Sequence, residues 1–309
     1  MTLELSDFGS YYVGGSVRHV TEGTPTIVNF TRDVAFKRDP RGHYAYGHAY
    51  IQYFRPRERN ALPPVVLLHG GGMCGTTWET TPDGRRGWLH MLLQRGFEVH
   101  VIDSVERGRA GFSPDAFDGD PIERSMEEAW QLFRFGTAEN FSAKVPFKSQ
   151  QFPIKSINDF ARYFVPRWLN TAHLQVNALV QVLQKLQSSI LITHSQGGEI
   201  GFDAAEQVPY NLAAIIAIEP SGTPESIELL CQIPTVLLQG DYLYTDGRWE
   251  KRANTWQSLV QNLKARAATA TLVDLPTELG AGNSHLPMMD LNNEMCLEVA
   301  LNKLQESKN

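Results

Sequence analysis

Residues 190–200 place a serine where its side chain could act as a nucleophile. A short apolar run predicts a buried strand, and a helix-like pattern begins directly after Ser195. A strand that turns so abruptly into a helix forces the residue at the turn into a strained backbone conformation and exposes its side chain. Gly197 and Gly198 would let the new helix pack closely against the strand. We therefore predict a nucleophile elbow with Ser195 at its tip, although Thr193 stands where a glycine is usual.

A serine hydroxyl needs an imidazole within hydrogen-bond reach to take its proton. His285 is the histidine we predict for this role, because it lies in a late loop rich in glycine, asparagine and serine. We expect these small neighbours to make the loop flexible enough to bring His285 to the serine. His69 and His194 are instead expected to pack and to hold the neighbouring loops.

The imidazole in turn needs a carboxylate that fixes its tautomer and stabilises its charged form. Glu219 ends an apolar run, where an unpaired carboxylate would be costly, and a partner such as His285 would offset that cost. Asp241, directly after Gly240, is the alternative. The order serine, acid, histidine holds with either residue. We favour Glu219 as the acid. The other interpretation of Glu219 is a cap at the start of a helix, since Pro220 follows it.

A tetrahedral intermediate also needs preorganised amide donors. The buried run at residues 65–68 ends in a histidine and three glycines, which allow the backbone to turn and expose its amides. We predict an oxyanion hole made by the backbone N–H groups of Gly71 and Gln196. Gly72, Met73 and Trp78 follow nearby and are predicted to contact the substrate.

These residues require a scaffold that brings strand ends together. Continuous apolar runs predict buried parallel strands, separated by helical patterns, so the chain should form a mostly parallel α/β sheet flanked by helices. Two alternating segments suit antiparallel strands near a sheet edge. The predicted strands are 11–20, 44–54, 65–68, 97–103, 190–194, 212–218, 233–238 and 270–273, the helices 88–95, 176–183, 248–267 and 292–304, with a loop at 275–287.

Residues 114–170 interrupt this pattern with an aromatic-rich stretch between a strand and the next core helix. An insertion of this size predicts a cap or lid over the active site, within a single domain of residues 1–309. The alternative is a small helical subdomain that covers the core without touching a ligand. The aromatic side chains favour a bulky or aromatic substrate.

Composition excludes several classes of protein. The 309 residues carry a net charge of −6, which argues against nucleic-acid binding. Three cysteines, Cys74, Cys231 and Cys296, are too few and too far apart for a zinc site or a disulfide framework, and we predict no metal site. Without an apolar run of 18 residues or a leader pattern, we expect a cytoplasmic protein away from the membrane, although a leader removed beforehand would leave no trace.

The motifs at 69–72, 103–113, 194–198 and 283–285 resemble the α/β-hydrolase superfamily. More narrowly, residues 78–88, 218–220 and 282–285 resemble the bacterial carboxylesterase group typified by esterase 713. The resemblance implies a cofactor-free serine carboxylesterase that permits a homodimer, with its acid at Glu219. That group can carry cysteines where this chain has Gly71 and Gly72. Hydrolysis of a lactone, an amide or a carbon–carbon bond, or ligand binding without catalysis, remain alternatives.

Overall fold

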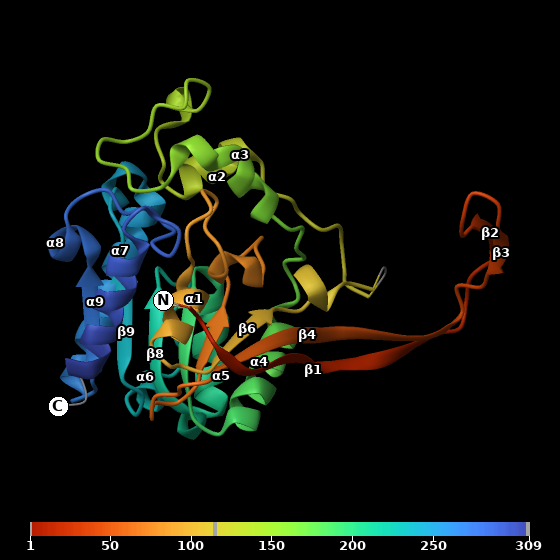
Figure 1. Ribbon diagram of the computed structural model, residues 1–309, viewed down its shortest axis with the longest axis horizontal. Helices are drawn as coiled ribbons and strands as arrows, with labels where there is room; N and C mark the ends of the chain where they lie inside the picture. The colour runs from red at the N-terminus through yellow and green to blue at the C-terminus, as the bar shows by residue number, and fades with distance from the viewer. Residues whose placement is uncertain (1, 114–115, 307–309) are drawn as a thin grey trace.

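The protein is represented by a computed structural model that describes residues 2–113 and 116–306. In this part of the chain eight strands form one sheet, in the order β1-β4-β6-β5-β7-β8-β9-β10 (Figure 1). Met1 and residues 114 and 115, where the predicted single domain and the predicted insertion begin, lie outside the described residues. The strands of this sheet are β1 (Leu5–Val20), β4 (Gly42–Pro56), β5 (Val65–Leu68), β6 (Val99–Asp103), β7 (Ser189–His194), β8 (Leu212–Ile218), β9 (Thr235–Gln239) and β10 (Ala270–Asp274).

The sheet is parallel from β6 to β10, whereas β4 runs antiparallel to both β6 and β1. The central strands β5 and β7 are buried along their whole length, which explains why their apolar runs show no alternation. Val65 and Leu67 face one hydrophobic core cluster and Val66 and Leu68 face the other. The predicted mostly parallel α/β sheet is confirmed.

Helices cover both faces of the sheet (Figure 1). The first cluster includes α1 and α9, and the second includes α4, α5 and α7. No helix in the described ranges is long and apolar enough to cross a membrane. The helices are α1 (Trp88–Gln94), α2 (Met126–Leu132), α3 (Ile157–Phe160), α4 (Ala172–Leu186), α5 (Gln196–Gln207), α6 (Ile227–Leu230), α7 (Gly247–Ala265), α8 (Leu275–Leu279) and α9 (Asn293–Glu306).

The predicted loop at 275–287 was partly wrong, because it begins with the short helix α8. The Asp274 side chain accepts a hydrogen bond from the N–H of Thr277 and thereby caps this helix. Pro276 stands in the first turn, where its missing N–H costs nothing.

Between β6 and α4 the chain leaves the sheet and forms α2, α3 and several single helical turns. Figure 1 shows this segment above the sheet. Its aromatic rings pack against one another, including a stack of Phe135 on Phe152 with centroids 4.0 Å apart and an edge contact of Phe133 with Phe160. This segment therefore has a small aromatic core of its own that is continuous with the core around α1 and α9.

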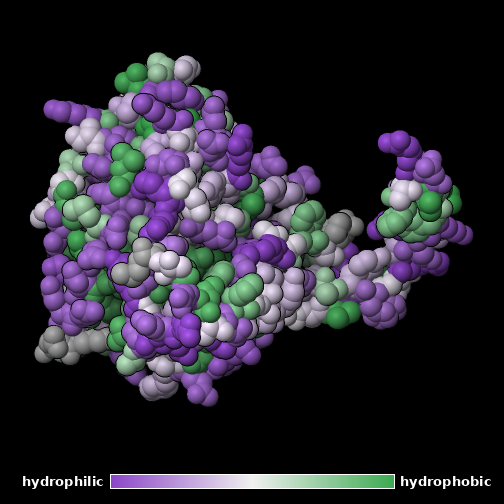
Figure 2. Space-filling model, viewed as in Figure 1, coloured by the Kyte–Doolittle hydropathy of each residue, from purple (hydrophilic) through white to green (hydrophobic). Residues whose placement is uncertain are grey.

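The paired strands β1 and β4 extend beyond the sheet as a long arm, which carries the hairpin of β2 (Thr26–Asn29) and β3 (Ala35–Arg38) at its tip (Figure 1). Figure 2 shows apolar side chains among polar ones at this tip. Ile27, Phe30 and Phe36 are all exposed there. The sequence analysis missed β2 and β3, because neither strand has a buried face to impose an alternating pattern.

Candidate active site

Ser195 connects β7 to α5 with φ +52° and ψ −118°. A positive φ is uncommon for a residue with a Cβ, and its strain is tolerated only where the surroundings enforce it. Here the Ser195 N–H donates to the carbonyl oxygen of Ile218 in the neighbouring strand at 2.9 Å, while its own carbonyl accepts from Gly198 and Ser221. The structure thus places Ser195 at the tip of a sharp strand-to-helix turn.

Glycines in α5 make this close approach feasible. A Cβ on Gly198 would lie 2.3 Å from the Cβ of Pro220, and one on Gly197 would lie 2.5 Å from a backbone carbonyl oxygen after β5. A Cβ on Gly201 would lie 2.8 Å from the Thr193 methyl group. Gly201 therefore provides the space that Thr193 takes up in place of the usual glycine.

Nδ1 of His285 donates a hydrogen bond to Oε2 of Glu219. Glu219 is fully buried and also accepts from the N–H of Gly240 at 2.7 Å and from the guanidinium of Arg134, with Nη1 at 2.8 Å from Oε2. Burial by itself would raise the pKa of Glu219, but the charge of Arg134 and the hydrogen bonds that Arg134 and His285 donate outweigh it and hold the pKa well below the usual range. Glu219 is therefore an ionised carboxylate that can orient the imidazole.

The imidazole of His285 is enclosed on several sides. It stacks on Phe133 with centroids 5.6 Å apart, and its ring centroid lies 4.6 Å from those of Trp249 and His194. Nε2 of His194 donates to the carbonyl oxygen of His285 at 2.9 Å. Burial is the main cause that lowers the pKa of His285 to about 4. His285 is thus neutral at physiological pH and can accept a proton.

The hydroxyl of Ser195 lies 3.4 Å from the hydroxyl of Ser221. Among the described residues, the Ser195 hydroxyl forms its side-chain hydrogen bond with Ser221. No hydrogen bond joins this hydroxyl to His285 in the same part of the chain. Ser221 comes two residues after Glu219, so the same strand end supplies both the acid and a polar neighbour of the nucleophile. Sequence reasoning did not identify Ser221.

Asp241, the alternative acid, points elsewhere. Its Oδ2 accepts from the N–H of Gly282 at 2.9 Å and its Oδ1 from the N–H of Tyr242 at 2.7 Å. Its carbonyl oxygen accepts from Nε of Arg134. Of the two carboxylates weighed from the sequence, Glu219 is the one in contact with His285.

The loop that carries His285 is fixed by buried hydrogen bonds. Asn283 and Ser284 are fully buried, and both donate to Oδ2 of Asp290, at 2.9 and 2.8 Å. The expectation of a flexible loop was therefore wrong, because small polar residues here fill a buried network. Burial raises the pKa of Asp290 to about 7.

The glycine loop after β5 lies beside the nucleophile. A Cβ on Gly70 would lie 3.1 Å from the Cβ of Ser195, and one on Gly71 would meet the side chain of Gln196 at 2.6 Å. In the described part of the chain, the N–H groups of Gly71 and Gln196 have no acceptor. Nε2 of His69 accepts from a backbone N–H at 3.1 Å and its Nδ1 donates to the carbonyl of Gly70 at 2.9 Å, so this histidine supports the loop.

The three residues predicted to contact substrate differ in position. Gly72 belongs to the loop, with φ +71°, and its carbonyl accepts from the N–H of Val165 at 2.9 Å. Met73 and Trp78 are 1% and 0% exposed and pack in the core, so their side chains do not reach an open surface. For these two residues the structure disagrees with the expected substrate contact, because the chain turns inward after Gly72.

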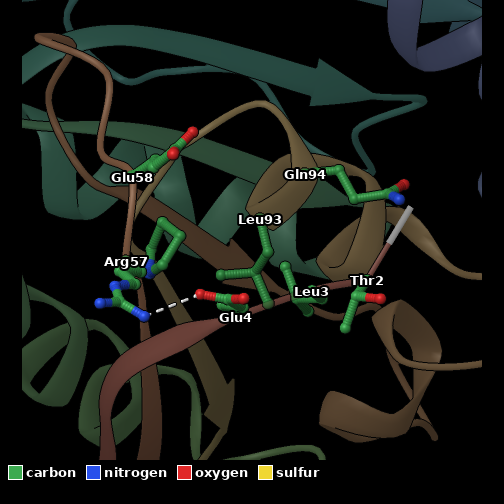
Figure 3. Close-up of a pocket in the computed structure, with 8 residues that line it drawn as sticks. Thr2, Leu3, Glu4, Arg57, Glu58, Leu93 and Gln94 are labelled. Carbon is green, nitrogen blue, oxygen red and sulfur yellow. Dashed lines mark hydrogen bonds and ion pairs between the residues drawn. The ribbon is translucent and has the colours of Figure 1, made fainter.

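Two hollows do not have Ser195, Glu219 or His285 in their lining. One of about 240 Å³ lies between the N-terminal residues and the end of α1, and it is bordered by the ion pair of Glu4 with Arg57 (Figure 3). Another, of about 490 Å³, is lined largely by apolar atoms from residues within 106–112, 117–121 and 165–168. The three cysteines are unpaired, and no cluster of His, Cys, Asp and Glu in the described residues is arranged to hold a metal ion.

Comparisons with known proteins agree with this fold. Residues 65–297 match the model of the alpha/beta hydrolase family. The chain is similar to the structure of a novel bacterial esterase, with 29% identity, a TM-score of 0.87, and coverage of 100% of this chain and 98% of that one. The peroxisomal α/β-hydrolase Lpx1 from Saccharomyces cerevisiae has a TM-score of 0.50 at 11% identity, over 97% of this chain and 89% of its own, which shows a common fold alone.

A fungal protein (Fungal sp., strain ATCC 74256) named a probable secreted lipase, phiG, is 26% identical over 191 residues. The match covers 59% of this chain and 52% of the fungal one. The chain therefore spans about half the length of the curated relative that it matches.

Proposed function

The chain belongs to the α/β-hydrolase family, and we propose that it hydrolyses carboxylic esters through an acyl-enzyme formed on Ser195. The observation that carries this proposal is the pairing of a strained Ser195 at a strand-to-helix turn with a buried Glu219–His285 hydrogen bond at the neighbouring strand ends. The similarity to a bacterial esterase over the whole chain supports an ester as the substrate.

In the proposed mechanism, Nε2 of His285 takes the proton of the Ser195 hydroxyl as its oxygen attacks the ester carbonyl. The hydroxyl must first rotate away from Ser221, since apo active sites often tighten their hydrogen bonds only when substrate binds. Glu219 keeps the proton of His285 on Nδ1 and stabilises the imidazolium that forms. The N–H groups of Gly71 and Gln196 receive the negative charge on the former carbonyl oxygen.

Collapse of this intermediate expels the alcohol, which takes the proton back from His285. Water then attacks the acyl-enzyme with the same histidine as base. The second intermediate expels the Ser195 oxygen, which takes the proton back from His285, and the carboxylic acid is released. The attack by Ser195 and the later attack by water each need a neutral imidazole at their start, and the burial that lowers the pKa of His285 to about 4 supplies it.

We also propose that residues 114–170 cap the site and favour a bulky or aromatic ester. The ring of Phe133 in this segment stacks on the His285 imidazole. The carbonyl oxygen of Phe133 accepts a hydrogen bond from the backbone N–H of His285 at 3.2 Å. Arg134 reaches Glu219, and Val165 bonds to Gly72. The segment thus contacts both the proposed triad and the glycine loop, which favours a cap over a subdomain remote from the ligand.

Pairing of two copies remains a prediction, for which the arm offers exposed apolar side chains at Ile27, Phe30 and Phe36. A cytoplasmic location is likewise still a prediction, and the fungal relative is named as secreted.

Labelling tests the proposed function. A fluorophosphonate should form one adduct, which peptide mass spectrometry should locate on Ser195. Ser195→Ala should lose both the adduct and the hydrolysis of 4-nitrophenyl acetate, while its circular dichroism stays that of the parent. A folded parent protein that gains no adduct at Ser195 would show the proposal to be wrong.

A further inference from the structure

We infer that the active site selects esters that carry a carboxylate, and that Arg124 and Arg167 bind this carboxylate beside the glycine loop. The inference rests on the proposed esterase function and names its substrate class. It is carried by the position of the two guanidinium groups, by an unsatisfied buried donor and by the local balance of charge.

The backbone holds both arginines close to the glycine loop. Ile122 and Arg167 exchange backbone hydrogen bonds in both directions, at 2.8 and 3.1 Å, so the segments before Arg124 and around Arg167 run side by side. Two residues before Arg167, the N–H of Val165 donates to the carbonyl of Gly72 at 2.9 Å. The two arginine-bearing segments are therefore fixed relative to the proposed oxyanion hole.

Successive glycines lead from the nucleophile to the two guanidinium groups. Gly70 lies against Ser195, a Cβ on Gly71 would lie 2.1 Å from Nη1 of Arg167, and a Cβ on Gly72 would lie 3.8 Å from Nε of Arg124. Two Cα–Cα steps span at most about 7 Å. A carboxylate two or three carbon atoms from the scissile carbonyl would fit between the nucleophile and these cations.

One buried donor of Arg124 is unsatisfied, and the hydrogen bond of Arg167 goes to an uncharged acceptor. The side chain of Arg124 is only 9% exposed, and its Nε is buried without a hydrogen-bond partner among the residues described. Its Nη1 donates to the exposed Glu128 at 2.6 Å. Nη1 of Arg167 donates to a neutral oxygen, Oε1 of Gln196, at 2.8 Å. A buried donor without an acceptor is costly, and a ligand carboxylate would supply the missing acceptor.

The charges around this point are unbalanced. Burial first, and then the positive charges of Arg107 and Arg124, lower the pKa of Arg167 to about 10. Arg107 already pairs with Glu106 at 3.0 Å, and Arg124 pairs with Glu128, whereas Arg167 has a neutral partner. This local excess of positive charge stands out in a chain of net charge −6 and favours a monoanionic substrate.

The competing explanation is that both arginines only hold the loops in place. Such a role would affect neutral and anionic esters equally, so the informative quantity is the ratio of the two kcat/KM values. Monomethyl succinate and methyl 4-methylpentanoate form a matched pair, since an isopropyl group replaces the carboxylate. For a carboxylate on the alcohol side, acetoxyacetate and isobutyl acetate form the second pair, again with an isopropyl group in place of the carboxylate. Hydrolysis is followed by titration at constant pH.

The parent protein should prefer the anionic member of at least one pair. Arg124→Gln and Arg167→Gln should each lower this preference by about tenfold or more, because each removes a charge-assisted hydrogen bond. Arg124→Lys and Arg167→Lys should retain part of it. Arg162→Gln is the matched control, since Arg162 is an exposed arginine of the same segment and should leave the ratio unchanged.

This inference is wrong if the protein hydrolyses the esters through Ser195 but prefers neither anionic ester. It is also wrong if both glutamine variants retain the preference of the parent. Either result would leave the proposed esterase intact. Failure to hydrolyse any of the four esters in a Ser195-dependent way would overturn the proposed function itself. The pair that shows the preference identifies the side of the ester that carries the carboxylate.

Discussion

Arg134→Met tests how the buried acid is stabilised. Glu219 is fully buried, and Arg134 donates to both of its carboxylate oxygens from a side chain that is 1% exposed. Removing one partner of a buried ion pair leaves the other charge uncompensated and typically costs about 3–5 kcal/mol. We therefore expect the free energy of unfolding to fall by about that amount at pH 7, whereas Arg134→Lys should lose less because it keeps the charge.

The same variant should shift the pH dependence of catalysis. Burial lowers the pKa of His285, Glu219 raises it, and Arg134 and Arg252 lower it. His194, which also packs on this ring, is held neutral because burial lowers its own pKa. Losing Arg134 should therefore raise the pKa of His285, and the acid limb of kcat/KM should move to higher pH by on the order of one unit.

Urea denaturation followed by tryptophan fluorescence measures the first effect, and kcat/KM for a neutral ester between pH 4 and 8 measures the second. Arg162→Met serves as the exposed control for both. An unfolding free energy within about 0.5 kcal/mol of the parent, the range usual for surface substitutions, would refute the buried-pair argument. An acid limb that stays in place or moves to lower pH would refute the electrostatic argument.

Three further predictions concern single substitutions. Glu219→Gln should lower kcat far more than Asp241→Asn, because Glu219 contacts His285, and steady-state kinetics with the reverse pattern would move the acid role to Asp241. Burial raises the pKa of Asp290 to about 7, so the folded state holds this proton more tightly than the unfolded state does. The resulting contribution to stability is complete below about pH 4 and is lost as pH rises through 7. Asp290→Asn should therefore be more stable than the parent at pH 8, with a gap that narrows toward pH 4 in denaturant titrations; a gap that widens instead would contradict this. Gly198→Ala should cost about 1–3 kcal/mol, because its Cβ would lie 2.3 Å from that of Pro220, while Gly247→Ala has open space and should fold like the parent in thermal melts.

The scaffold could be predicted because its signals are local. Residues 65–68 and 212–218 are continuous apolar runs, and burial on both faces of a parallel sheet requires such runs. The turn at Ser195 could be predicted for the same reason, since the strand, the glycines and the following helix are adjacent in the sequence. Both signals report a geometry that neighbouring residues impose on one another.

The contacts that complete the site could not be predicted in this way. Arg134 and Glu219 are 85 positions apart, and their pairing depends on how an insertion with few regular turns folds back onto the sheet. An arginine between Phe133 and Phe135 is a weak signal, visible only as a charge within an aromatic stretch. The role of Asp290 was equally hidden, because its partners lie in a loop whose composition suggested flexibility.

The arm formed by β1 and β4 separates the tip hairpin from the proposed chemistry. In β2 and β3 nearly every residue is exposed, so this hairpin adds little to either core cluster. Exposed hairpin tips that carry little of the core are the sites at which proteins best tolerate cleavage and inserted domains. The segment between β2 and β3 is therefore a natural attachment point for a fluorescent reporter or an affinity tag, which would stand well clear of the central sheet and leave both chain ends free (Figure 1).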